Sequence, residues 1–138
     1  MRIVFDTNIY VSAFVIPGGQ AKAALLKAVE GEAQLVVSRA IIHELLEVLA
    51  RKFGRDPEEL AHVAVFLAEL ADVVRPRRTL KVLRDDADNR ILECALAGQA
   101  DVIVTGDRAM LALGEYQRVR IVTLREFLQV HEHESQDH

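Results

Sequence analysis

Two aspartates follow short apolar runs of the sequence. Asp6 comes directly after Ile3–Phe5, and Asp107 comes after Val102–Val104, with Thr105 and Gly106 between. Runs that are apolar throughout are typical of strands in a parallel sheet covered on both faces. Because ligands of such sheets bind beyond the carboxyl ends of the strands, we expect both carboxylates at one edge. Either aspartate alone could be an ordinary turn or cap residue, but two at one edge favour a site.

A third carboxylate, Glu44, lies in an amphipathic helix that is predicted to start after Ser38 and to run to about Phe53. Glu44 borders the apolar stripe of this helix, whereas Glu47 lies opposite its middle and is expected to be solvated. Glu44 can therefore point along the edge of the sheet, although boundary carboxylates are also common surface groups. The stripe consists of Ile41, Ile42, Leu45, Leu46, Val48 and Leu49.

The fourth carboxylate is Asp88, at the start of a helix that we expect to begin near Asp88 or Asn89. The apolar residues that follow lie on one face of this helix, and Asp88 lies on the same face. Its side chain is therefore predicted to face inward. The alternative is a plain helix cap, which aspartate also favours. Asp85 and Asp86 crowd the same position, and either could share or assist the role of Asp88.

Four converging carboxylates without a basic partner repel one another strongly. Oxygen ligands of this kind suit Mg²⁺ or Mn²⁺, whose charge removes the conflict. One or two such ions could activate a water molecule and stabilise the charge that grows on phosphorus. The four residues therefore indicate metal-assisted hydrolysis of a phosphate ester.

Alternating strands and helices must position these groups, and they predict an α/β fold: a three-layer α/β/α sandwich with a central, mainly parallel sheet. We expect one domain over residues 1–130 and a disordered tail over residues 131–138, where the histidines could be read as a metal site by composition only. The expected strands are Ile3–Phe5, Leu35–Val37, Val73–Val74, Val102–Val104 and Ile121–Val122. The expected helices cover 21–29, 38–53, a segment after the Asp56–Glu59 start signal, a segment from about 88, 109–113 and 124–129.

Composition limits the class of protein. The chain has 138 residues, is 51% hydrophobic and has a formal net charge of -4, so it has no overall attraction for nucleic acid. The single cysteine, Cys94, cannot form an internal disulfide and is expected to be a buried thiol. With no signal peptide or membrane span in the pattern, we expect a cytoplasmic protein that does not contact membranes.

Taken together, four short motifs resemble the PIN-domain family. They are the strand running into Asp6 and Asn8, the helix segment His43–Leu46 around Glu44, the helix opening Asp88–Ala95, and the strand that ends in Thr105-Gly106-Asp107. The resemblance runs in order from Arg2 to about Leu128. Each motif is weak alone, whereas the ordered set is specific.

The resemblance implies a metal-dependent ribonuclease in which Asp6, Glu44, Asp88 and Asp107 hold the metal and carry the catalysis. It also implies that Asn8 orients Asp6 and that Thr105 or Thr7 hydrogen-bonds neighbouring carboxylates, with Asp85 in a supporting position. In small single-domain members it implies the toxin half of a toxin–antitoxin pair (VapC-like). The expected partners are then RNA as substrate, a cognate antitoxin protein and a second copy of the chain in a homodimer.

A basic stretch leads up to Asp88, and it could hold the RNA backbone or be an ordinary solvated loop. Its members are Arg75, Arg77, Arg78, Lys81 and Arg84. Two other functions compete with the ribonuclease. A phosphatase of the haloacid-dehalogenase type also has an aspartate after its first strand, but it needs a second aspartate where Asn8 stands. A non-catalytic RNA-binding or scaffolding module on the same fold is less consistent with four intact acids.

Overall fold

A computed structural model of the chain describes residues 1–129, which include a six-stranded sheet in the order β3-β2-β1-β4-β6-β5. Neighbouring strands are parallel except for β5 and β6, which pair antiparallel. The prediction of a mainly parallel sheet is therefore confirmed. The strands are β1 (Arg2–Phe5), β2 (Gln34–Ser38), β3 (Asp72–Val74), β4 (Val102–Val104), β5 (Glu115–Tyr116) and β6 (Val119–Val122).

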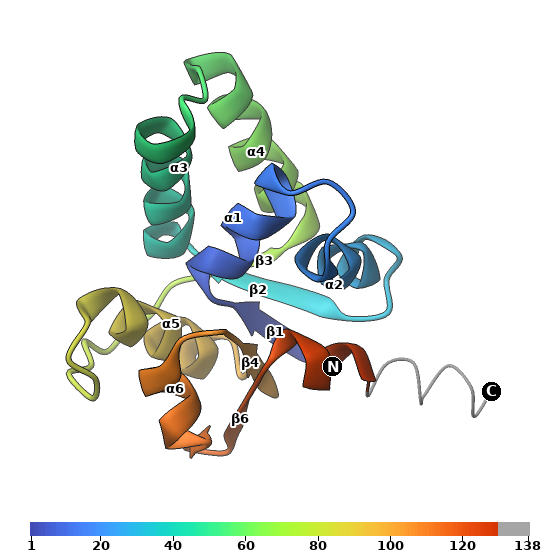
Figure 1. The fold of residues 1–138 in the computed structure, drawn as a ribbon. Coiled ribbons are helices and arrows are strands. Elements are labelled where there is room, and N and C mark those ends of the chain that lie inside the picture. Colours follow the sequence, from blue (N-terminus) through green and yellow to red (C-terminus); the bar gives the residue numbers. More distant parts are fainter. Residues whose placement is uncertain (130–138) are drawn as a thin grey trace.

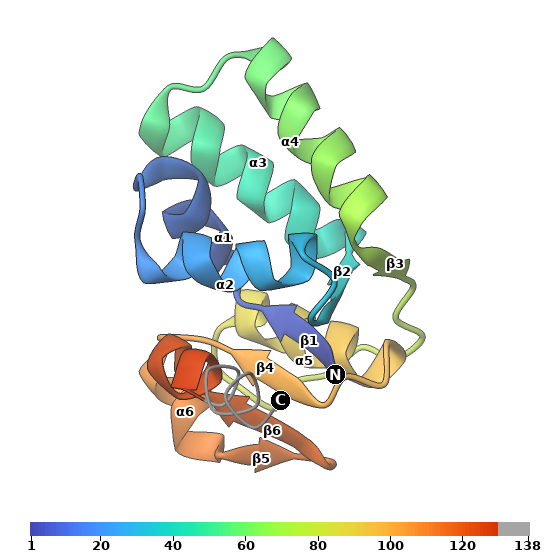
Figure 2. The same cartoon turned by 90° about the vertical axis from the view of Figure 1, so that its right-hand side faces the viewer.

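Helices cover both faces of this sheet, as predicted. In Figure 1, α1 to α4 lie above β1 and β2, whereas α5 and α6 lie at the lower left, beside β4 and β6; Figure 2 shows the same arrangement turned by 90°. Right-handed crossovers explain the division, because the chain moves outward from β1 to β3 and then back to β4 and β6. The helices are α1 (Thr7–Val15), α2 (Gln20–Val29), α3 (Arg39–Phe53), α4 (Pro57–Leu70), α5 (Asp86–Ala97), α6 (Arg108–Leu113) and a last helix over residues 124–129.

The order in which strands are added to the sheet reverses between β1 and β4, which are parallel neighbours. Phe5 pairs with Val104 in register, and the backbone N–H of Asp6 donates to the carbonyl of Val104 at 3.0 Å. A reversal of this kind opens a crevice beyond the carboxyl ends of the two strands. The fold thus brings the residues after β1 and after β4 to one edge of the sheet, as the sequence predicts.

An aliphatic core holds the sheet to its helices. Ile3, Val4 and Phe5 are fully buried, and the Phe5 ring makes edge contacts with Tyr10 of α1 and with Phe127. Cys94 is also buried, as expected, and its burial raises the pKa of the thiol to about 12. At the end of α5 a Cβ on Gly98 would overlap the side chain of Val36, so glycine allows α5 to approach β2 closely.

Three elements differ from the sequence prediction. Helix α1 was not predicted; it begins directly after the first strand because Asp6 caps it, accepting from the backbone N–H of Asn8 at 3.3 Å. Helix α5 begins at Asp86, earlier than predicted, because Asp85 is its cap. Strand β5 was not predicted, since the turn to β6 uses Gln117 and Arg118 in left-handed conformation, and the Asn-Gly signal of such turns is missing.

Among residues 1–129, no single helix is long and apolar enough to cross a membrane. Helices α1 and α2 reach that length and composition only as a pair, and they are bent by 98° relative to each other. The predicted tail at 131–138, with its histidines, lies outside the described residues.

Candidate metal centre

Asp6 lies at the centre of the acidic edge. Its side chain is 6% exposed, and one carboxylate oxygen, Oδ2, accepts a 2.6 Å hydrogen bond from the Thr105 hydroxyl. The other oxygen caps α1 through the backbone N–H of Asn8. The contact from Asn8 to Asp6 is made by the backbone N–H, and the Asn8 side chain is exposed.

Thr105 links Asp6 to Asp107. Its fully buried hydroxyl donates to Asp6 and accepts from the backbone N–H of Asp107 at 3.0 Å. Asp107 then caps α6, where Oδ1 accepts from the backbone N–H of Met110 at 3.0 Å. One threonine thus fixes the turns after β1 and β4 relative to each other, in the supporting role predicted for it.

Glu44 approaches the same edge from α3. Its side chain is half-buried, and its Oε2 accepts from the Thr7 hydroxyl at 3.4 Å. Glu47, one turn further on, is exposed. The different orientations predicted for the two glutamates are therefore confirmed. Burial, together with the charge of Asp6, raises the pKa of Glu44, and the bond from Thr7 opposes that rise.

Asp88 faces inward from the first turn of α5 and is 6% exposed. The cap of this helix is Asp85, which accepts from the backbone N–H of Ala87 at 2.9 Å and is itself exposed. The structure thus gives the capping role to Asp85 and leaves Asp88 free to face the other acids. Among the described residues, none donates a hydrogen bond to the Asp88 side chain or forms an ion pair with it.

The four carboxylates, Asp6, Glu44, Asp88 and Asp107, are called the carboxylate cluster below. Burial raises the pKa of Asp88 to about 7, and the charges of Asp107, Asp6, Asp85 and Glu44 add to the rise. The pKa of Asp6 is also raised by burial and by Asp107, against the lowering effect of the Thr105 hydrogen bond. Buried acids with raised pKa values and only acidic neighbours are typical of functional sites.

The donor set of the carboxylate cluster fits Mg²⁺ or Mn²⁺ in kind. It offers only oxygen atoms, and within residues 1–129 no Lys, Arg or His forms an ion pair with any of its members. No three acidic, histidine or cysteine side chains of the described part are grouped closely enough to hold one ion by themselves. Ligands from water or substrate would complete the coordination, as Mg²⁺ usually requires.

The predicted basic residues lie on the segment between β3 and α5, and the last of them, Arg84, directly precedes Asp85, the cap of α5. This basic loop, residues 75–84, is anchored to α5 by two buried polar side chains that sequence reasoning missed. Asn89 accepts from the backbone N–H groups of Val82 and Leu83 and donates to the Leu83 carbonyl, and Glu93 accepts from the N–H of Leu80. Their polarity on an otherwise apolar helix face was the available signal.

Known proteins are similar to this chain in fold or in sequence. A chain in the crystal structure of VapBC2 from Rickettsia felis, bound to a DNA fragment from their promoter, has a similar fold, with a TM-score of 0.63 and 16% identity over 89% of this chain and 98% of that one. A chain in the structure of VapBC-1 from nontypeable Haemophilus influenzae gives 0.55 and 19%, covering 91% and 99%. The uncharacterized protein MJ1680 of Methanocaldococcus jannaschii is 23% identical over 94% of this chain and 90% of its own length.

The fold and its acidic edge define an α/β protein with a carboxylate cluster at the reversal point of a mainly parallel sheet. The model of the PIN domain family matches residues 2–109, so the chain belongs to that family. Members of this family are typically nucleases and generally bind divalent metals. The matched residues include all four members of the carboxylate cluster.

Proposed function

We propose that this protein is a divalent-metal-dependent endoribonuclease that hydrolyses phosphodiester bonds of RNA. The observation that carries the proposal is the state of Asp88: a buried carboxylate with a raised pKa, surrounded by further acids. Such an arrangement lowers the stability of the folded protein unless a cation compensates it. Family membership supports the same conclusion.

Each residue has a role in this proposal. Asp6, Glu44, Asp88 and Asp107 hold one or two Mg²⁺ or Mn²⁺ ions. A bound ion would stabilise the charge that develops on the phosphate and lower the pKa of the attacking water. Thr105 holds Asp6 in place, and Thr7 orients Glu44. Asp85 supports the cluster by capping α5, which fixes the direction of Asp88.

The fold similarity to chains of two VapBC structures supports a more specific proposal. The protein is the toxin of a toxin–antitoxin pair, acts as a homodimer in the cytoplasm, and has a cognate antitoxin protein as its partner. A short neighbouring reading frame with a DNA-binding pattern would support this role. The family match favours a nuclease over the haloacid-dehalogenase-type phosphatase, for which Asn8 is also the wrong residue.

Cleavage of RNA in the presence and absence of metal tests the function. We expect the purified protein to cleave RNA with Mg²⁺ or Mn²⁺ and to lose this activity when a chelator is added. Full activity in excess chelator would rule out the metal-dependent mechanism. RNA binding without cleavage in either metal would favour the non-catalytic RNA-binding module instead.

A further inference from the structure

A groove of about 800 Å³ runs between the basic loop and the flank of α5. A second hollow of about 280 Å³ shares Val74, Arg75, Pro76 and Glu93 with it and reaches Arg39 at the start of α3. Glu93 follows Asp88 by five residues in α5, so it lies about 7.5 Å further along the helix axis and about 140° around it. Side chains that line the groove include Arg75, Arg77, Arg78, Glu93, Leu96 and Gln117.

Three arginines of this groove lie close together in the chain. Arg75, Arg77 and Arg78 are exposed, and none of them forms an ion pair in the described part of the chain, as is true of most of its arginines. Free guanidinium groups, all within four positions of the chain, favour an anionic ligand.

The acid of the groove is already compensated. Glu93 is 9% exposed, and its Oε2 accepts from the Leu80 N–H at 2.8 Å and from Arg90 Nη2 at 3.1 Å. The electrostatic character of the groove is therefore set by the arginines. This contrasts with the negative net charge of -4 on the whole chain.

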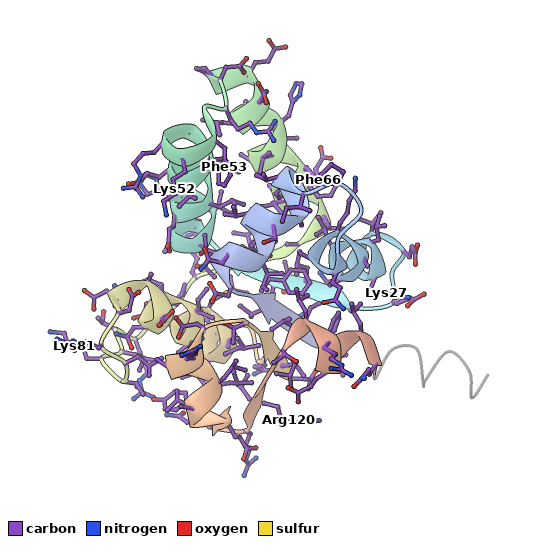
Figure 3. All side chains as sticks on the ribbon, viewed as in Figure 1. Lys27, Lys52, Phe53, Phe66, Lys81 and Arg120 are labelled. Carbon is purple, nitrogen blue, oxygen red and sulfur yellow. The ribbon has the colours of Figure 1, made fainter. Side chains whose placement is uncertain are left out.

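The basic loop that carries these arginines is held in place before any ligand arrives. Leu80 is buried, and the Asn89 side chain bonds the loop backbone at 3.0, 2.8 and 2.8 Å. Anchoring of this kind lowers the entropic cost of binding. Figure 3 shows Lys81 at the outer tip of the loop, projecting into solvent, so we assign the binding to the arginines at the base of the loop.

We infer that this groove binds the phosphate backbone of a single-stranded segment of the RNA substrate, outside the carboxylate cluster. The inference rests on the proposed function, since it takes RNA as the substrate. A volume of this size lies in the range of about 300–1,000 Å³ that holds whole small ligands, so a few nucleotides of one strand fit.

The residues that line the groove also predict how the RNA strand is held. None of the ten residues that line the groove is aromatic, so bases have no ring to stack on, and arginine contacts to phosphate carry no sequence information. Binding should therefore depend on salt, tolerate any sequence and leave the chemical step unchanged.

The inference is tested by measuring how tightly the full chain binds a labelled single-stranded RNA oligonucleotide, about ten nucleotides long. Chelator is present in the assay, because the RNA is then expected to stay uncut. The test variant is Arg77→Gln/Arg78→Gln. The matched control is Arg51→Gln/Lys52→Gln, which removes the same charge from the end of α3, where Figure 3 labels Lys52. Thermal melting checks that both variants are folded.

The groove variant should bind at least about tenfold more weakly than the parent, and the slope of log K against log salt should fall by about 1.4, which is two lost single-strand contacts. The control variant should bind the same oligonucleotide with nearly the affinity and the salt slope of the parent. Equal losses in the two variants, or an unchanged slope, would overturn the inference.

Cleavage assays separate this result from the proposed function. With metal present, the groove variant should raise KM and leave kcat unchanged, because the arginines contact RNA away from the reacting phosphate. If the parent cleaves RNA but the groove and control variants have the same KM, the groove inference fails alone. If the groove binds RNA with the expected slope but no metal supports cleavage, the proposed function fails instead.

Discussion

Acidic side chains lie at both ends of the sheet, and their surroundings differ. At the amino end, Asp72 begins β3 and Asp101 precedes β4, and both accept hydrogen bonds from Arg2. The Arg2 guanidinium donates to Asp72 at 2.7 Å and to the Gly98 carbonyl at 2.7 Å, and the Arg2 backbone N–H donates to Asp101 at 2.8 Å. The charge of Asp72 is paired with Arg2 and Asp101 accepts a backbone hydrogen bond, so we interpret the arrangement as structural.

At the carboxyl end, the carboxylate cluster has hydroxyl and backbone donors but, in the described residues, no cationic partner. Its members are also more buried: Asp6 and Asp88 are each 6% exposed, whereas the Asp72 side chain is 47% exposed. The same residue type is thus compensated at one end of the sheet and left uncompensated at the other. Under the proposed function, this difference separates acids that stabilise the fold from acids that would hold a metal ion.

The largest expected effect is on the rate of RNA cleavage, when the same substitution is made at two positions of α3. Glu44→Gln should lower the rate of RNA cleavage at least about thirtyfold, or about 2 kcal/mol in the barrier, because it removes one oxygen ligand from the carboxylate cluster. Glu47→Gln removes the same charge one turn away, from an exposed position, and should change the rate less than about twofold. Initial rates at saturating metal check both, and equal losses would contradict the assignment of Glu44.

A smaller effect is expected in the pH dependence of stability without metal. The pKa of Asp88 rises from 3.8 to about 7 on folding, so between these values the folded state binds more protons than the unfolded state. The stabilising contribution is complete below pH 3.8 and is lost as pH rises through about 7. The free energy of unfolding of the metal-free protein should therefore fall over this window.

Urea unfolding at a series of pH values in chelator measures this slope. Asp88→Asn should flatten the fall between about pH 4 and 7, while Asp101→Asn, at the compensated end, should keep the slope of the parent. Parallel curves for the parent and Asp88→Asn would mean that Asp88 is not held in an uncompensated acidic environment.

Much of the carboxyl end could be predicted from the sequence, because periodic patterns fix which way a side chain points. The apolar stripe of α3 separated Glu44 from Glu47, and that of α5 turned Asp88 inward; both orientations are confirmed. The apolar runs before Asp6 and Asp107 predicted that both aspartates lie at one edge of the sheet, but the strand order that makes β1 and β4 neighbours was not predicted.

Other features depended on contacts between distant segments. The Thr105–Asp6 bond spans 99 positions of the chain, and the bonds from Asn89 and Glu93 to the basic loop link segments with no shared pattern. Helix α1 was missed although Asp6 was considered as a possible cap, because residues 7–15 are mostly apolar and show no clear amphipathic pattern. A residue that both caps a helix and belongs to a functional site gives one sequence signal for two roles.

Melting curves of the parent and Asp88→Asn, with Mn²⁺ and with chelator, test most directly whether the carboxylate cluster is built for a cation. Asp88 is the best probe because Asp6 and Asp107 also cap helices, so replacing either would remove structural bonds too. We expect metal-free Asp88→Asn to melt no lower than the metal-free parent. Mn²⁺ at a hundred times its Kd should stabilise the parent by about 2.7 kcal/mol and the variant far less. A variant that melts well below the parent in chelator, with no response of either protein to Mn²⁺, would contradict the account.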